Sequence, residues 1–186
     1  MERNLMVAGF GGQGVRTLGK FLASAACDAT EKQVTFFPSY GAEQRGGTAN
    51  CYVVISDEAV GAPIPDEADD LIVMNEPSLD RFLGVLKKGG TLFLNSSIIR
   101  KRPDREDITV IEAPVTDLAI EMENPRSLNI IMLGVYIGYT GVLDDQVIRD
   151  VIAHKFAAKP AVLAVNEKAF EKGLAIGKAA KKNCNH

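Results

Sequence analysis

The sequence has few of the residues that build metal centres and histidine-based catalytic sites. Its 186 residues include three cysteines, Cys27, Cys51 and Cys184, which lie far apart and form no C-x-x-C pair. This spacing argues against a disulfide framework and against a zinc or iron–sulfur site, so we expect two core thiols, Cys27 and Cys51, and one tail thiol. His154 fits a helix end or the surface, and His186 is terminal, so neither supports a catalytic triad or a metal site. We therefore expect no catalytic residue and no metal ligand in this chain.

Long apolar runs and a strong excess of one charge are also missing. No apolar stretch reaches the ~18 residues that a membrane span needs. With 21 basic and 24 acidic residues, the net charge is −3, which gives no general attraction to nucleic acid or to an anionic membrane. No basic and apolar leader precedes the first expected strand. The composition is that of an ordinary globular protein, and we expect a single domain over residues 1–186, located in the cytoplasm.

Glycine, by contrast, is concentrated in two loops. The first loop follows a short apolar run, Leu5–Ala8, which is typical of a buried strand. Gly9, Gly11 and Gly14 then match the spacing G-x-G-x-x-G, ahead of a helical pattern that starts at Val15. In such a turn the glycines allow a tight bend, close approach to a diphosphate, and close packing of helix on strand. Free N–H groups at the helix start then face an anion.

Two interpretations of this turn stay open: a phosphate-binding turn, or a glycine turn that only packs the first strand against its helix. An ordinary NAD site is disfavoured, because its second strand ends in an Asp or Glu that binds the ribose hydroxyls. Here the strand expected over Gln33–Pro38 ends in Phe36-Phe37-Pro38-Ser39. Arg16 lies in the first helical turn, where a positive charge opposes the helix dipole unless an anion is bound nearby. A solvated surface position is the alternative for Arg16.

The second glycine-rich loop, residues 39–47, follows that strand and is the more distinctive of the two. Polar and aromatic side chains stand among its glycines, an arrangement suited to binding another molecule; an Arg45–Glu43 pair that closes the loop is the structural alternative. Both loops follow strands, so we expect them at one edge of the sheet, where such folds bind ligands. The candidate binding residues are Gly9, Gly11, Gly12, Gln13, Gly14, Ser39, Tyr40, Glu43, Arg45, Gly46 and Gly47.

The rest of the chain alternates strands with helices. Further strands are expected over 48–56, 71–74, 91–94 and 110–111, and helices over 15–30, 77–86, 116–122, 127–140, 144–155 and 167–182. Lys87-Lys88-Gly89-Gly90 is typical of a helix stop. The helix over 127–140 is apolar all round, which predicts burial in a core or a subunit interface, and Gly134 and Gly138 on one face admit another backbone. This order predicts an α/β fold: one Rossmann-like domain with a doubly wound, mainly parallel sheet and helices on both faces.

With both loops in view, the sequence resembles a known family. Gly-Phe-Gly-Gly-Gln-Gly-Val at 9–15 and Ser-Tyr-Gly-Ala-Glu-Gln-Arg-Gly-Gly-Thr at 39–48 resemble the signatures of the gamma subunit of 2-oxoacid:ferredoxin oxidoreductases. The resemblance covers nearly the whole chain. It implies a multi-subunit enzyme that converts a 2-oxoacid such as 2-oxoglutarate, coenzyme A and oxidised ferredoxin to acyl-coenzyme A, carbon dioxide and reduced ferredoxin. It also implies that alpha, beta and ferredoxin-like subunits hold thiamine diphosphate, magnesium and the iron–sulfur clusters, none of which this chain binds alone.

The resemblance implies that this chain helps to assemble the enzyme and to shape its site. Coenzyme A is a possible ligand, and the glycine loops would bind its diphosphate. Two alternatives remain. One is the smaller subunit of indolepyruvate ferredoxin oxidoreductase, whose sequence is similar, and the other is a stand-alone nucleotide-binding module without redox chemistry. The sequence does not fix the 2-oxoacid, because its side chain should meet mainly the partner subunits.

Overall fold

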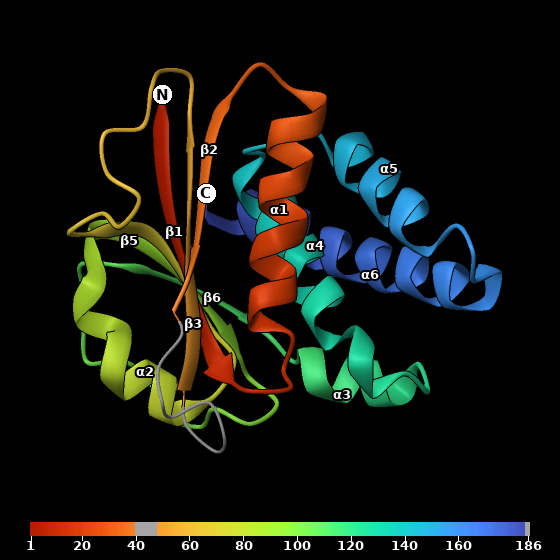
Figure 1. Ribbon diagram of the computed structural model, residues 1–186. Helices are drawn as coiled ribbons and strands as arrows, with labels where there is room; N and C mark the ends of the chain where they lie inside the picture. The colour runs from red at the N-terminus through yellow and green to blue at the C-terminus, as the bar shows by residue number, and fades with distance from the viewer. Residues whose placement is uncertain (40–47, 185–186) are drawn as a thin grey trace.

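A computed structural model describes residues 1–39 and 48–184 (Figure 1). Its elements, in chain order, are β1 (Glu2–Phe10), α1 (Val15–Ala29), β2 (Gln33–Pro38), β3 (Thr48–Ser56), β4 (Ala68–Val73), α2 (Glu76–Phe82), η1 (Leu83–Val85), β5 (Leu86–Asn95), β6 (Thr109–Ala113), α3 (Val115–Glu121), η2 (Pro125–Ser127), α4 (Leu128–Thr140), α5 (Asp145–Phe156) and α6 (Pro160–Cys184). The strands form one sheet in the order β2-β3-β1-β4-β5-β6. Strands β1, β4, β5 and β6 pair in parallel, whereas β3 runs antiparallel to both β1 and β2. The predicted α/β fold with a mainly parallel sheet is confirmed, with β3 as its reversed strand.

Both faces of the sheet are covered by helices, but unequally. Side chains such as Val7 and Ile72 point into a large core shared with α1, α4, α5 and α6. Their neighbours Met6 and Leu71 point to the other face, where they meet Leu79 of α2. This alternation is the two-residue period of a strand buried on both sides. Figure 1 shows the resulting layers, with α2 on one side of the sheet and the other large helices opposite.

Helix α4 is enclosed by its own chain. Its residues from Asn129 to Gly138 are all buried. Gly134 and Gly138 face the backbone of α6 near Leu174, and Gly173 and Gly177 of α6 in turn face the backbone of α4. The prediction that Gly134 and Gly138 admit another backbone is therefore confirmed. The second backbone belongs to α6, so this helix forms part of the core.

The predicted helix stop at 87–90 is wrong. Helix α2 ends at Phe82, and the short turn η1 leads into β5 at Leu86, so these four residues belong to a strand. The N–H of Gly89 donates to the carbonyl of Asp107 (2.7 Å) with a φ of +74° at Gly89. Basic residues followed by glycines are typical of a helix end, but here they form an irregular strand that pairs with β4.

Two further details differ from the sequence prediction. Helix α6 begins at Pro160, ahead of the expected start at residue 167. Its first turns are apolar in sequence (Pro-Ala-Val-Leu-Ala-Val at 160–165) yet largely exposed, and proline is common at a helix start. Cys27 is exposed on α1 and is not a core thiol as predicted, whereas Cys51 is buried and Cys184 is exposed, as expected.

Candidate functional site

The turn between β1 and α1, residues 10–14, lies at the carboxyl edge of the sheet. The N–H of Gln13 donates to the carbonyl of Phe10 (3.2 Å), and Oε1 of Gln13 accepts from the N–H of Phe10 (2.7 Å). Strand β2 runs in the same direction as β1, because both are antiparallel to β3, so Ser39 follows β2 at the same edge. Thr48, at the start of β3, pairs with Phe10. The strand ends that flank both glycine loops meet at this edge, as predicted.

The glycines of the turn are needed for different reasons. Gly9 is packed, since a Cβ there would lie 2.8 Å from Cβ of Met74. Gly14 precedes α1 in the left-handed conformation (φ +72°), and a Cβ there would lie 2.7 Å from Cγ of Asn129. Gly12 also has a positive φ (+97°), but a Cβ there would meet no described atom within 4 Å. As far as residues 1–39 and 48–184 go, the space beside Gly12 is open, as the close approach of a ligand to the backbone requires.

The side chain of Gln13 fixes the turn to the neighbouring strands. Its Nε2 donates to the carbonyl of Met74 (3.1 Å), and its Oε1 accepts from Nδ2 of Asn75 (3.1 Å). Asn95, at the end of β5, donates to the same carbonyl (3.2 Å) and to Oγ1 of Thr116 (2.9 Å). Sequence reasoning missed this network, although an Asn directly after each of two apolar strands was its signal. Contact of Gln13 with a ligand stays a prediction.

The start of α1 presents donors that the helix itself does not use. Among the described residues no side chain caps this end, and the first turn holds no acidic residue. The helical ladder begins with the bond from Leu18 N–H to the carbonyl of Gly14 (2.8 Å), so the N–H groups before Leu18 lie outside it. Arg16 and Thr17 are exposed in this first turn. Such a helix start favours an anion.

A pocket of about 280 Å³ lies over this helix start. Its walls come from the glycine turn, the first turn of α1 and the strand ends beside the second loop: Phe10, Gly11, Gly12, Gly14, Val15, Arg16, Thr17, Ser39 and Ala49. This volume is near the lower end of the range of about 300–1,000 Å³ for small-molecule pockets, and it is large enough for a phosphate or diphosphate group. Of the predicted residues, the structure brings Gly11, Gly12, Gly14 and Ser39 together here. The others in the second loop, Tyr40, Glu43, Arg45, Gly46 and Gly47, lie outside the described residues.

The buried thiol of Cys51 lies beneath this pocket. Its Sγ is 3.6 Å from the carbonyl oxygen of Val15. Burial raises the pKa of Cys51 to about 12, and the guanidinium of Arg16 only partly opposes this shift. The thiol is therefore protonated at neutral pH and acts as a core residue, not as a nucleophile.

A second polar cluster, which sequence reasoning missed, lies toward the opposite edge of the sheet. The fully buried carboxylate of Asp70 accepts from Nε and Nη2 of Arg3 (2.5 and 2.9 Å) and from the hydroxyl of Tyr136 (3.0 Å). The hydrogen bond to Asp70 raises the pKa of Arg3, and burial raises the pKa of Tyr136. The cluster joins β1, β4 and α4. An Asp inside the apolar run of β4 was the available sequence signal.

Metal-binding and membrane-spanning features are not seen in the described residues. Over 1–39 and 48–184 no group of three or more His, Cys, Asp or Glu residues is placed to hold a metal ion. His154 is exposed in the last turn of α5, which confirms its predicted place at a helix end. No helix in this part of the chain is both long and apolar enough to cross a membrane.

Comparison with known proteins gives a family and several relatives. The chain matches the model of the pyruvate ferredoxin/flavodoxin oxidoreductase family over residues 4–176. The ketoisovalerate oxidoreductase subunit VorA of Methanothermobacter marburgensis is 41% identical over 92% of this chain, which spans 36% of VorA. The 2-oxoglutarate synthase subunit KorC of Methanocaldococcus jannaschii is 30% identical over 96% of this chain and 95% of KorC. The indolepyruvate oxidoreductase subunit IorB of Pyrococcus horikoshii is 31% identical over 99% of this chain and 98% of IorB.

Solved structures agree with these relatives. The 2-oxoglutarate:ferredoxin oxidoreductase from Magnetococcus marinus, with 2-oxoglutarate, coenzyme A and succinyl-CoA bound, has a TM-score of 0.88 at 29% identity, over 96% of this chain and 31% of that one. The gamma subunit of a keto/oxoacid ferredoxin oxidoreductase from Geobacter sulfurreducens has a TM-score of 0.83 at 26% identity, over 95% and 99% of the two chains. The resemblance inferred from the two glycine motifs is confirmed. The chain belongs to the pyruvate ferredoxin/flavodoxin oxidoreductase family, in which it corresponds to the gamma subunit.

Proposed function

We propose that this chain serves as the gamma subunit of an enzyme that oxidatively decarboxylates a 2-oxoacid and transfers the acyl group to coenzyme A. The carboxylate leaves as carbon dioxide, two electrons pass to ferredoxin, and the coenzyme A thiol loses its proton as the thioester forms. The family match over residues 4–176, which includes both glycine motifs, carries this proposal. The names of KorC and VorA support 2-oxoglutarate or a branched-chain oxoacid as the substrate.

This chain contributes binding and positioning to the proposed reaction. Alpha, beta and ferredoxin-like subunits would hold thiamine diphosphate with its magnesium, which would supply the carbon chemistry, and the iron–sulfur clusters, which would carry the electrons. In the described residues the chain offers no cluster of metal ligands, and its buried thiol at Cys51 is protonated. Its surfaces therefore complete a site that it shares with those subunits.

Within the complex, the glycine turn receives phosphate groups of coenzyme A. Three features support this assignment: the open space beside Gly12, the uncapped start of α1, and the exposed Arg16 in its first turn. Backbone N–H groups and a helix dipole together favour a phosphate at such a place. Arg45 would form bidentate hydrogen bonds to a phosphate or to a carboxylate of the partner subunit. Lys cannot form this bidentate contact.

Steady-state kinetics of the assembled enzyme test this role of the turn. Gly12→Val fills the open space and should raise the KM for coenzyme A at least about tenfold, and Arg45→Lys should weaken binding by about 1–3 kcal/mol. Gly89→Val is the matched control, because Gly89 also has a positive φ (+74°) and open space around it but lies in β5. It should leave the KM for coenzyme A unchanged.

The outcomes separate the two roles of the loops. A raised KM with intact assembly supports phosphate binding, and lost assembly with Arg45→Lys supports a subunit contact. If Gly12→Val and Arg45→Lys both assemble and show normal kinetics for coenzyme A and the oxoacid, the loops are structural turns and the assignment is wrong.

A second candidate is the smaller subunit of an indolepyruvate oxidoreductase. The match to IorB over 98% of its length at 31% identity favours it. Assay of the purified complex with 2-oxoglutarate, ketoisovalerate and indolepyruvate separates the two candidates. A stand-alone nucleotide-binding module is disfavoured, because the family match extends far beyond the first strand and helix.

A further inference from the structure

A groove runs along the exposed side of α1, from the glycine turn to α5. One hollow of about 680 Å³ lies between α1 and α5, and a second of about 820 Å³ lies between the glycine turn, the start of α4 and the junction of α5 with α6. Phe21 and Lys155 line both hollows, and Thr17 lines both as well as the glycine-turn pocket. The two hollows therefore adjoin each other and form one surface, the α1 groove.

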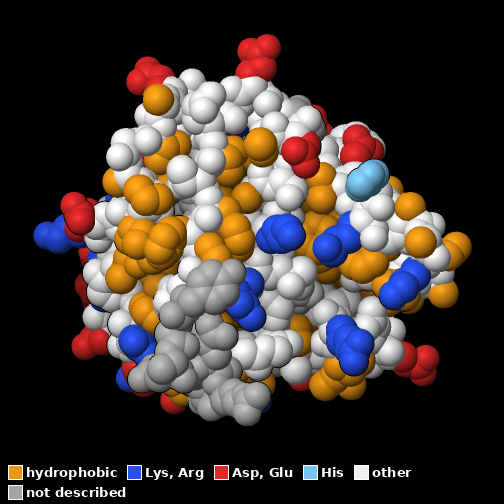
Figure 2. Space-filling view, in the orientation of Figure 1, with side chains coloured by type: hydrophobic (Ala, Val, Ile, Leu, Met, Phe, Trp, Pro, Cys, Tyr) orange, Lys and Arg blue, Asp and Glu red, His pale blue; other side chains and the backbone are white. Residues whose placement is uncertain are grey.

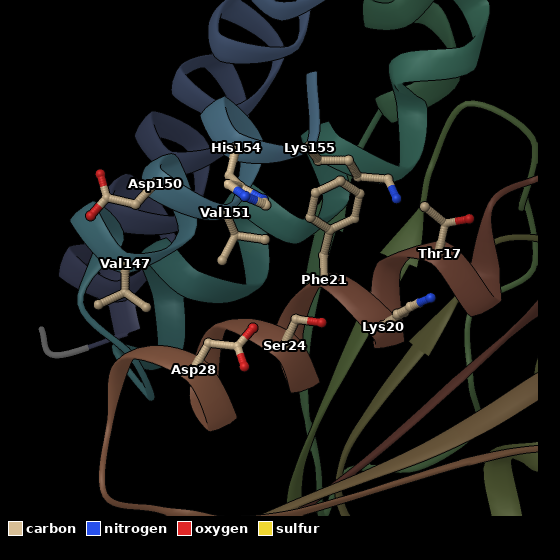
Figure 3. A pocket seen from close by; sticks show the side chains of 10 residues that line it. All are labelled: Thr17, Lys20, Phe21, Ser24, Asp28, Val147, Asp150, Val151, His154 and Lys155. Atoms are coloured by element: carbon tan, nitrogen blue, oxygen red, sulfur yellow. The ribbon is translucent and has the colours of Figure 1, made fainter. Parts of the chain in front are cut away.

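The floor of the α1 groove is apolar. Phe21 projects from α1 toward α5, and Val147 and Val151 line the same hollow from α5 (Figure 3). Ile130 of α4 and Val162 of α6 continue this lining in the second hollow. Val162 is 38% exposed. Phe21 and Ile130 are themselves buried (3% and 2% exposed), so the apolar surface that the groove offers comes from the half-buried Val147 and Val151 and from Val162.

Basic side chains surround this floor. Lys20 and Lys155 stand at one end of the first hollow (Figure 3), and Lys159 and Arg126 line the second. Over residues 1–39 and 48–184, none of these four side chains forms an ion pair. Figure 2 shows Lys and Arg side chains gathered over the centre and right of this face, with hydrophobic side chains between them. This positive surface occurs in a chain whose net charge is −3.

The charge changes sign along the groove. Asp28 and Asp150 lie at the end of the first hollow away from Lys20 and Lys155 (Figure 3). At the basic end, the Nζ of Lys155 lies 5.4 Å from the ring centroid of Phe21. The part of the groove nearest the glycine turn is thus mainly basic, with Glu123 as the acidic residue in the lining of the second hollow, and the far end is acidic. An occupant that matches it carries carboxylates on the side facing the glycine turn.

We propose that the α1 groove docks an amphipathic, mainly acidic segment of a partner subunit. This inference rests on the proposed function, which supplies the partner. Apolar side chains of the segment cover Val147, Val151 and Val162, and its carboxylates meet Lys20, Lys155 and Lys159, as in other groove-bound helices. Two adjoining open hollows extend past a single small-molecule pocket, commonly about 300–1,000 Å³, which favours a chain segment as the occupant.

Charge reversal tests the docking site. The full-length chain with Lys20→Glu and Lys155→Glu is titrated against the partner subunits purified from the enzyme complex. We expect affinity to fall at least about tenfold, mainly through slower association, with a smaller difference at high salt. The control reverses Lys181 and Lys182, two exposed lysines in the last turn of α6. These positions match Lys155, which also lies in the last turn of its helix. The affinity of the control variant for the partner subunits should stay within about twofold of wild type.

A photo-cross-linking group at Ser24, on the edge of the first hollow, identifies the occupant directly. We expect a cross-link to a partner segment that carries several Asp or Glu residues beside apolar ones. Circular dichroism checks that every variant folds. If charge reversal prevents folding, the neutral double variant Lys20→Ala and Lys155→Ala takes its place. It should weaken binding about threefold or more.

Each other outcome has a distinct meaning. Folded variants that bind the partner subunits with unchanged affinity overturn the docking site while leaving the proposed function intact. A cross-link to a second copy of this chain, or to coenzyme A, also overturns it. If the wild-type chain binds no partner subunit at all, the proposed function itself fails.

Discussion

Replacing Gly173 of α6 with alanine should destabilise the protein, although alanine is the better helix former. A Cβ at this position would lie against the carbonyl oxygen of Ile131, 2.8 Å from its carbonyl carbon and 3.0 Å from the nitrogen of Val135. All three atoms belong to the backbone of the buried helix α4, which cannot turn aside as a side chain can. The two helices must therefore move apart.

The change in the free energy of unfolding is the balance between the better helix propensity of alanine and the costs of overpacking and of weakened helix contacts. Alanine gains about 1 kcal/mol over glycine in a helix interior. Overpacking typically costs about 1–3 kcal/mol, and more where the obstructing atoms cannot relax. Separation of α4 from α6 also weakens the contacts at Gly134, Gly138 and Gly177. Because the obstructing atoms are backbone, we expect the upper part of this balance, a net loss of about 1–2 kcal/mol, equivalent to a fall in Tm of about 2–8 °C for a chain of this length.

Urea unfolding followed by circular dichroism measures this loss, with Gly84→Ala as the control. Gly84 lies in η1 and is exposed, and a Cβ added there would meet no described atom within 4 Å. This control should stay within about 1 kcal/mol of wild type. A Gly173→Ala variant as stable as the Gly84→Ala variant would refute the close packing of α4 on α6.

Two further predictions concern buried groups. Asp70→Asn should lower the free energy of unfolding in urea by about 3–5 kcal/mol, because it leaves the guanidinium of Arg3 without its carboxylate. A loss below about 1 kcal/mol would contradict the pairing of Arg3 with the buried carboxylate. At pH 8, a thiol reagent should label the exposed Cys27 and Cys184 quickly and Cys51 only after unfolding, because burial raises the pKa of Cys51 to about 12; rapid labelling of native Cys51 would contradict its burial.

The sequence predicts the elements better than their ends. Strong apolar runs and clear periodicity locate β1, α1 and α4, because burial on one or all faces leaves a pattern in the residues themselves. Segment 87–90 resembles a helix end, because lysines and glycines are typical there. Its place in β5, at the irregularity between the pairs of Leu86 and Thr91 with β4, depends on contacts distant in the sequence, such as that of Gly89 with Asp107. The prediction for Cys27 is wrong because Cys27 lies off the apolar face of α1, which the spacing of Leu18, Leu22 and Ala25 defines.

The site is predictable in outline for a similar reason. The spacing of Gly9, Gly11 and Gly14 indicates a turn at the carboxyl edge, and strand direction places Ser39 beside it. The spacing cannot show that Gly12 is the glycine with open space, since φ and free volume depend on the folded turn. It also cannot show Asn129, which approaches Gly14 from a helix far along the chain.

The central claim is that this chain works as the gamma subunit of a 2-oxoacid-oxidising complex. Its most direct test is to isolate the tagged chain from its own cells and to assay the isolated material for viologen reduction. We expect reduction that requires both a 2-oxoacid and coenzyme A when the co-purifying subunits are present, and none with the chain alone. Turnover by the chain alone, or a complex without any 2-oxoacid-dependent reduction, would contradict it.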